Sequence, residues 1–276
     1  MRSFYKLSAS LIGLLMLLAT FSSALVLAGT LTAPTMAVES QIGSNWYSSN
    51  WSGYVVNSSK GSVTYVYGSW RVPTVTGSRG TTAYSSFWVG IDGFIGSNTV
   101  EQIGTDSDVQ NGKAAYYAWY EFYPSAMVQI SSLTINPGDT ISASVTYVSG
   151  TTFTVSITDV TTGKSYSTTG SVAGATETSA EWIAEAPSSY TGVLPLANFG
   201  TVKFGYDNTG VTATCDATVK GVTGSIGSFG SVSGKVVQEI TMVTYRIVRK
   251  ASPSTLSSDG TSFSVTWESS GSTEFM

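Results

Sequence analysis

Short runs in which apolar residues alternate with serine and threonine dominate the chain after residue 37. Ser62–Trp70, Thr140–Tyr147, Phe153–Ile157 and Ser262–Trp267 are examples, and glycine, asparagine and aspartate lie between such runs. This two-residue period, with many β-branched residues, is typical of strands that bury one face. The pattern predicts an all-β chain of about a dozen strands, closed as a single-domain sandwich of two antiparallel sheets.

Three segments fit the alternation less well. Asn45–Asn57 is rich in serine and tryptophan and is predicted to form the first strand. Gly221–Gly234 reads as a glycine- and serine-rich loop that is too polar to pack, and Ser269–Met276 as a flexible C-terminal tail. Because no linker or internal repeat interrupts the rest, residues 38–268 are expected to form one domain.

The first 37 residues have the layout of a signal peptide. Arg2 and Lys6 precede the apolar run Leu11–Ala28, and small residues follow it. We therefore expect residues 1–37 to be removed and the rest to be secreted, without membrane contact after cleavage. The alternative is an uncleaved anchor, because Leu11–Leu31 is long enough to span a bilayer.

Charged residues are scarce. They make up 11% of the chain, against about 25% in ordinary soluble proteins. Without the signal peptide, 11 Lys and Arg residues face 17 Asp and Glu residues. Since no basic patch is present, the sequence argues against nucleic acid as a partner.

The chain contains no histidine. This excludes a Ser-His-Asp or Cys-His catalytic site and a histidine-ligated zinc site. In a hydrolase of this composition, carboxyl groups would have to transfer the protons. Their reference pKa values lie near ~4, which suits chemistry in an acidic extracellular medium.

Cys215 is the one cysteine of the chain, so no intramolecular disulfide can form. It ends the alternating run Val211–Cys215. This position predicts a buried thiol that packs in the core.

One segment, Lys113–Pro124, combines many aromatic residues with a glutamate. Side chains alternate across a strand, so Tyr117, Trp119, Glu121 and Tyr123 are expected to share one face. A carboxyl group among aromatics suits the wall of a substrate groove. The alternative is an aromatic strand covered by a neighbouring loop.

Two further segments carry candidate groups. On a strand, Gln102 and Asp106 would point the same way, and a glutamine amide can donate to an oxyanion at any pH, although a solvated glutamine is equally compatible with the pattern. Glu181 and Glu185 would also share a face. Taken by itself, the segment that contains these two glutamates is more typical of an exposed edge strand.

Five motifs together resemble those of one family. They are Asn50–Tyr54, Phe87–Gly93, the run around Gln102, Trp119–Pro124 and Ala180–Ile183. In this order they are similar to motifs of the glutamic peptidases, or eqolisins, over about Trp51–Trp267. The resemblance implies two bent antiparallel sheets, of concanavalin-like or jelly-roll type, with a concave substrate groove.

The resemblance also implies roles for single residues. The family's catalytic glutamine falls on Gln102 and its catalytic glutamate on Glu181, which is preferred to Glu185 because it directly precedes a Trp-Ile pair. The glutamate would take a proton from the attacking water and return it to the leaving amine, while the glutamine stabilises the oxyanion. Residues expected to support the site or bind substrate are Trp51, Trp88, Asp92, Asp106, Trp119, Glu121 and Tyr123. Some members carry an acidic residue in place of Tyr117.

These considerations predict a monomeric acid endopeptidase that acts on polypeptides and needs no cofactor or metal. Two alternatives remain open. A secreted glycoside hydrolase would use Glu121 and Glu181 as its pair of carboxyl groups. A carbohydrate-binding module would instead stack sugar rings on the aromatic residues of Tyr117–Tyr123.

Overall fold

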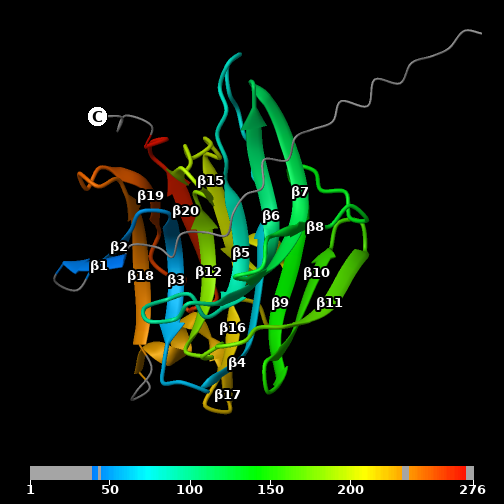
Figure 1. Ribbon diagram of the computed structural model, residues 1–276, viewed down its shortest axis with the longest axis vertical. Helices are drawn as coiled ribbons and strands as arrows, with labels where there is room; N and C mark the ends of the chain where they lie inside the picture. Colours follow the sequence, from blue (N-terminus) through cyan, green and yellow to red (C-terminus); the bar gives the residue numbers. More distant parts are fainter. Residues whose placement is uncertain (1–38, 43–44, 232–235, 272–276) are drawn as a thin grey trace, which may run out of the picture.

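The computed structural model describes residues 39–42, 45–231 and 236–271. The expected signal peptide and the end of the expected tail, residues 272–276, lie outside these ranges. The described strands form two layers that pack face to face, and antiparallel pairing dominates in both (Figure 1).

The first layer has the pairing order β7–β6–β5–β12–β3–β18, which Figure 1 shows from right to left. Short strands extend its edges. Its strands are β3 (Trp51–Asn57), β5 (Ser86–Ile91), β6 (Val100–Gln110), β7 (Lys113–Tyr123), β12 (Ser179–Glu185) and β18 (Val236–Val243), with β1 (Glu39–Ile42), β2 (Asn45–Ser48) and β8 (Val128–Gln129) at the edges.

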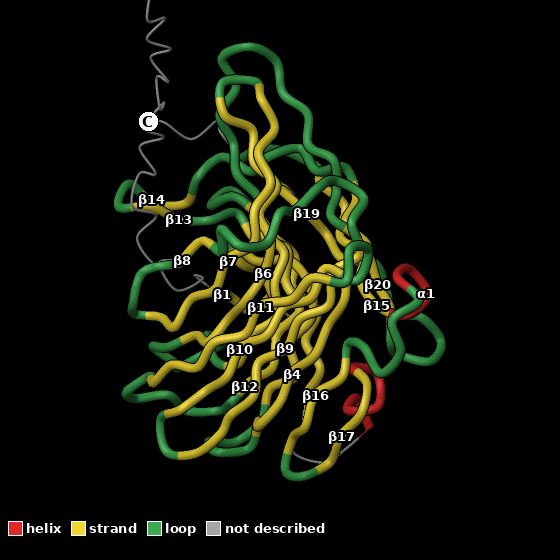
Figure 2. The backbone as a smooth tube through the Cα atoms, turned by 90° about the vertical axis from the view of Figure 1, so that its right-hand side faces the viewer, coloured by secondary structure: helices red, strands yellow, loops and turns green. Residues whose placement is uncertain are grey.

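In the second layer, β11, β10, β9 and β4 are consecutive neighbours, and β4 pairs on its other side with β16 and β15 (Figure 2). The layers are continuous at one edge, where β19 pairs with both β18 and β20. The strands are β4 (Val63–Arg71), β9 (Thr140–Ser149), β10 (Thr152–Asp159), β11 (Lys164–Ser171), β15 (Thr201–Gly205), β16 (Asp216–Val219), β17 (Val222–Ser225), β19 (Arg249–Pro253) and β20 (Ser262–Trp267).

Few other regular elements are described. A small hairpin joins β13 (Ser188–Ser189) and β14 (Gly192–Val193), just after β12. The two described helices are α1 (Tyr206–Thr209) and the 3-10 turn η1 (Ile226–Ser231). Neither is long and apolar enough to cross a membrane. The all-β architecture expected from the alternation is confirmed.

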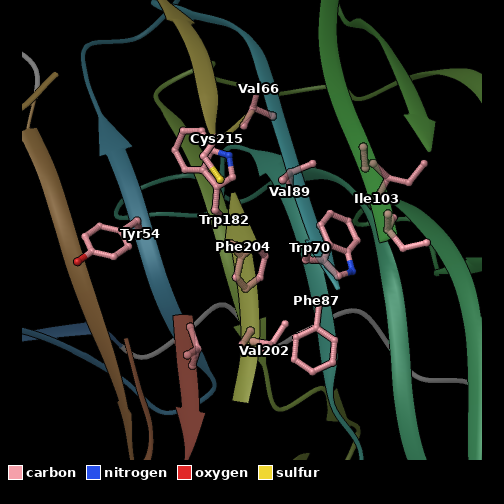
Figure 3. Packing of buried hydrophobic residues seen from close by; sticks show 14 of the residues in the cluster. Tyr54, Val66, Trp70, Phe87, Val89, Ile103, Trp182, Val202, Phe204 and Cys215 are labelled. Atoms are coloured by element: carbon pink, nitrogen blue, oxygen red, sulfur yellow. The ribbon is translucent and has the colours of Figure 1, made fainter. Parts of the chain in front are cut away.

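The main core lies between the two layers (Figure 3). Trp182 and Val89 enter it from the first layer, and Trp70 and Val66 from the second. Burial of each large apolar side chain contributes roughly 1.5–3 kcal/mol. The layers come close at Gly68, where a Cβ atom would lie 2.6 Å from a methyl carbon of Val89.

Two expectations about local structure are wrong. β12 is not an exposed edge strand, because it lies between β3 and β5 and all its residues are buried. The described part of Gly221–Gly234 is not an unpacked loop. It forms β17 and η1, and it buries Ile226 and Phe229 completely.

Other expectations are confirmed. The aromatic strand β7 divides as predicted, with Ala118 in the main core and Trp119 in a second cluster on the opposite face. Cys215 is buried, and burial raises the pKa of its thiol to about 12.

Candidate active site

Strand register places the main candidates on one face of the first layer, turned away from the main core. Gln102 on β6 lies opposite Glu121 on β7 and opposite Gly90 on β5. Gly90 in turn lies opposite Glu181 on β12. Directly paired residues in antiparallel strands project to the same side, so Gln102, Glu121 and Glu181 share this face.

A second row crosses the same face four residues further along β12. It contains Glu185, Ser86, Asp106 and Tyr117, each directly opposite the next. The face therefore carries two rows of acidic and polar side chains. Aromatic side chains separate them.

Those aromatic residues form the second apolar cluster. Trp88 and Trp119 lie on the row between the two acidic rows, and Trp51 packs edge to face on Trp88 with ring centroids 5.0 Å apart. The three indoles are almost completely buried, and Tyr123 packs against the same cluster. Four of the residues expected to support the site are thus side chains of one packed cluster.

Trp88 connects the rows. Its ring lies over Gly90, where a Cβ atom would be 2.8 Å from the ring carbon Cζ3. Its indole N–H donates to Oε2 of Glu185 over 2.7 Å, and the Asn50 amide donates to Oε1 of Glu185 over 3.0 Å. Glu185 is therefore held at both oxygens, while the Trp88 ring occupies the space over Gly90 between Glu181 and Gln102.

Gln102 and Glu121 are in direct contact. Nε2 of Gln102 donates to Oε2 of Glu121 over 2.6 Å, and both side chains are buried. The amide oxygen of Gln102 and the second carboxyl oxygen of Glu121 are also buried and have no hydrogen-bond partner within the described part of the chain. Buried polar atoms in this state are rare and often mark a place where a ligand supplies the missing bond.

The electrostatics tie Glu185 to this pair. Burial raises the pKa of Glu185 to about 8; the indole N–H of Trp88 opposes the shift, and the charge of Glu121 adds to it. Burial also raises the pKa of Glu121 to about 7, against the effect of the Gln102 amide. We call Gln102, Glu121 and Glu185 the glutamate cluster.

A separate acidic cluster continues the second row. The Tyr117 hydroxyl lies 2.7 Å from Oδ2 of Asp106 and 3.0 Å from Oδ2 of Asp108. Ser86 donates to the other oxygen of Asp106, and the Ser85 N–H to the other oxygen of Asp108. We call Asp106, Asp108 and Tyr117 the aspartate cluster.

One hydroxyl proton cannot serve two carboxylates at once. A hydroxyl can donate once and accept twice, so both contacts are favourable when one aspartic acid is protonated and donates to the Tyr117 oxygen. Burial raises the pKa of Asp106 to about 6. Burial, followed by the charge of Asp106, raises the pKa of Asp108 well above its usual range. Sequence reasoning missed Asp108, although its spacing of two from Asp106 on one strand was a signal that the two share a face.

Asp92 lies outside both clusters and has a structural role. It directly follows β5 and has a positive φ of 69°. Its carboxylate accepts the backbone N–H groups of Thr176, Glu177 and Thr178 over 2.6–2.9 Å. The hydroxyls of Thr176 and Thr178 donate to it as well. Asp92 thus fixes the segment that leads into β12.

The clusters contain no metal-binding arrangement of the usual kind. Among the residues that the structure describes, no three His, Cys, Asp or Glu side chains are grouped so as to hold an ion. The chemistry available on this face is that of carboxyl groups, a carboxamide and indole N–H groups.

Comparison with known proteins identifies the family. A model of the Peptidase A4 family matches residues 49–246. The chain belongs to this family. One relative is aspergillopepsin-2 of Aspergillus niger, which is 35% identical to this chain over 222 residues, or 69% of this chain and 77% of the relative.

Solved structures of similar proteins support the same family assignment. Scytalido-glutamic peptidase, solved with a transition state analog inhibitor, matches with a TM-score of 0.64 and 28% identity over 80% of this chain and 98% of that one. Aspergilloglutamic peptidase from Aspergillus niger matches with a TM-score of 0.56 and 30% identity over 67% and 99%. The resemblance to eqolisins is confirmed, and the chain is a hydrolase of the glutamic peptidase type that acts on peptide bonds. Neither carbohydrate alternative finds support in these matches.

Proposed function

We propose that this glutamic peptidase is a secreted endopeptidase that works in acid, with Gln102 as the oxyanion donor and a glutamate of β12 as the group that transfers the proton. The observation that carries the proposal is the glutamate cluster itself. It brings a carboxamide and two carboxyl groups together on a buried face, in a chain without histidine.

Of the two glutamates on β12, we propose Glu185 as the catalytic one. Its carboxyl group is oriented by Trp88 and Asn50, and its charge interacts with Glu121, the partner of Gln102. Glu181, favoured from the sequence, lies in register with Gln102, but the Trp88 ring covers Gly90 between them. Glu181 remains the second candidate for the same role.

In the proposed reaction, the Glu185 carboxylate accepts a proton from the water that attacks the scissile carbonyl. Gln102 has two amide hydrogens; one bonds Glu121, and the second is proposed to bond the oxyanion. The protonated Glu185 then gives its proton to the leaving amine. A raised pKa makes Glu185 a strong base once ionised, and hydrogen bonds from bound water and substrate would lower that pKa toward the acidic range.

Two substitutions test the assignment. Glu185→Gln and Glu181→Gln would be assayed on denatured casein at about pH 3–4, near the reference pKa of a carboxyl group, with binding of a peptide as the folding control. The proposal predicts that Glu185→Gln binds peptide without cleaving it and that Glu181→Gln stays active. The reverse result would restore Glu181, and full activity in both variants would refute a catalytic glutamate on β12.

Secretion needs its own test. We propose that residues 1–37 are a signal peptide that is removed on export, because their charges and apolar run have that layout. N-terminal sequencing of protein recovered from the medium would give a start close to residue 38. Protein that stays in the membrane with Met1 intact would favour the anchor.

A further inference from the structure

Two segments of the chain have the sequence of an acceptor for an N-linked glycan. They are Asn50–Ser52 and Asn57–Ser59. In such a sequon the side-chain amide nitrogen of the asparagine receives the glycan, and a serine or threonine stands two positions later. Asn50 directly precedes β3 and Asn57 is its last residue. The motif treats the two asparagines alike, so only their surroundings can distinguish them.

The first sequon is enclosed by the protein. Asn50 and Ser52 are both 0% exposed. Nδ2 of Asn50, the atom that would carry the glycan, donates to Oε1 of Glu185 over 3.0 Å. Oδ1 of Asn50 accepts from the Ser48 hydroxyl over 3.2 Å. A sugar on this nitrogen would have no room in the folded protein, and it would displace a hydrogen bond that holds Glu185.

The second sequon reaches solvent. Asn57 is partly exposed, and Ser59 is exposed in the turn that follows β3. Within the described part of the chain, the Asn57 side chain makes no hydrogen bond, and the Ser59 hydroxyl contacts the Ser62 hydroxyl over 2.9 Å. A bulky, hydrophilic glycan belongs at such a surface position. Attachment at Asn57 would break no side-chain hydrogen bond of that residue.

Asn57 is also distant from the proposed catalytic glutamate. Strand register places Asn57 opposite Ser179 and Trp51 opposite Glu185 on the neighbouring strand β12. Ser179 and Glu185 are six residues apart, which corresponds to about 20 Å along a strand. A glycan on Asn57 would therefore stand at the other end of β12 from Glu185, and cleavage of a short peptide should not depend on it.

We propose that Asn57 carries an N-linked glycan in the exported protein and that Asn50 carries none. The donor is a lipid-linked oligosaccharide. Nδ2 of Asn57 forms a bond to the anomeric carbon of the first sugar, the bond from that carbon to the lipid phosphate breaks, and the amide nitrogen loses one proton. The inference rests on the proposed function in one respect, because the chain must be exported to meet the transferase.

The test expresses the full chain in yeast, whose secretory pathway N-glycosylates exported proteins. Protein from the medium and from the membrane fraction would be treated with a peptide N-glycosidase in heavy-oxygen water. This treatment converts each glycosylated asparagine into a labelled aspartate that mass spectrometry of the peptides can locate. The label is expected at Asn57 and not at Asn50. A label at Asn50, or none at Asn57, would overturn the proposal.

Three variants check the assignment on the intact protein. Asn57→Gln and Ser59→Ala each destroy the second sequon, so both should lose the mass of the glycan and keep the kcat/KM of the wild type on a short peptide. Ser59→Ala leaves the asparagine in place and covers the case in which Asn57→Gln fails to fold. Ser52→Ala is the matched control: it destroys the first sequon without changing Asn50 and should keep the full mass. A glycan that persists in Ser59→Ala would contradict attachment at Asn57.

Failure of export can be told apart from failure of the glycan assignment. A chain that stays in the cytosol would contradict the proposed signal peptide. The same chain behind a yeast leader sequence would then enter the pathway, and the label at Asn57 would decide the proposal as before. Glycosylated protein that cleaves no peptide would contradict the proposed catalytic groups and leave the assignment of the glycan to Asn57 standing.

Discussion

Two buried acidic clusters lie on the same face of the same sheet, yet their carboxyl groups are held differently. In the glutamate cluster, Gln102 donates an N–H group to Glu121 and Trp88 donates one to Glu185. The buried amide oxygen of Gln102 and one buried carboxyl oxygen of Glu121 have no partner within the described chain. In the aspartate cluster, Tyr117 closes the contact between two carboxyl groups. The first cluster therefore keeps buried oxygens that a ligand could bond, whereas the polar side-chain atoms of the second are bonded within the protein.

The largest expected effect is on the pH dependence of stability. Both clusters contribute to it, because burial raises the pKa of their carboxyl groups. Between the unfolded pKa near ~4 and the raised folded pKa, the folded state holds more protons than the unfolded one. The free energy of unfolding should therefore be highest in acid and decrease as pH rises toward neutrality. The decrease is about 1.4 kcal/mol per pH unit for each extra proton that the folded state holds.

Urea unfolding at a series of pH values would measure this slope. Glu101, on the opposite face of β6, offers a single-site check: burial, then the charges of Asp92 and Glu177, raises its pKa to about 9. Glu101→Gln should flatten the profile, and Glu268→Gln, at an exposed position, should not. A stability that stays constant from pH 5 to 7.5 would contradict the shared behaviour of the clusters.

Substitutions in the two clusters should differ in their effect on kcat. Gln102→Ala removes the proposed oxyanion donor and is expected to lower kcat on the order of 10²–10³. Asp108→Asn copies the protonated aspartic acid, so it should keep kcat within a few-fold of the wild type while flattening the pH dependence of stability. Steady-state kinetics on one peptide would compare them, and equal losses would show that the clusters work as a unit.

The packing of the Trp88 ring between the two acidic rows should also affect stability and kcat. Gly90→Ala places a methyl group 2.8 Å from the Trp88 ring, and the ring must then shift away from Glu185. We expect a loss of about 1–3 kcal/mol from overpacking, together with reduced kcat. Gly230→Ala is the control, since its nearest side-chain atom is 4.0 Å from the added carbon. Thermal unfolding and kcat would be measured for both, and a neutral Gly90→Ala would mean that Trp88 is free to move.

The smallest expected effect concerns the aspartate cluster alone. Tyr117→Phe removes the hydroxyl that joins Asp106 and Asp108, at a cost of about 1–3 kcal/mol in stability. Tyr206→Phe, on the partly exposed helix α1, should cost much less. If unfolding in urea showed no difference between the two variants, Tyr117 would not hold the cluster together.

Much of this architecture was predictable from alternation. The period of two separates the Ala118 side of β7 from the Trp119 side because side chains on one strand must alternate. The same period cannot tell a central strand from an edge strand, since both alternate. For this reason the sequence predicts an edge strand for β12, which is in fact buried on both faces.

The choice between Glu181 and Glu185 shows a second limit. Both residues share a face under any register, so sequence spacing cannot decide which one meets Gln102. The two glutamates differ in their relation to the Trp88 ring. The ring covers Gly90, which lies between Glu181 and Gln102, whereas its N–H donates to Glu185. That depends on register with β5 and on a side-chain orientation, neither of which is visible in the sequence.

The binding of three successive amides by Asp92 has a consequence for alignment. A slip of one residue between β5 and β12 would turn Glu185 to the opposite side of the sheet. Asp92 at the end of β5 grips the chain immediately before β12, so such a slip would require several hydrogen bonds to break together. A carboxylate outside both clusters thus keeps β5 and β12 in the register that places Glu185 on the face of Gln102.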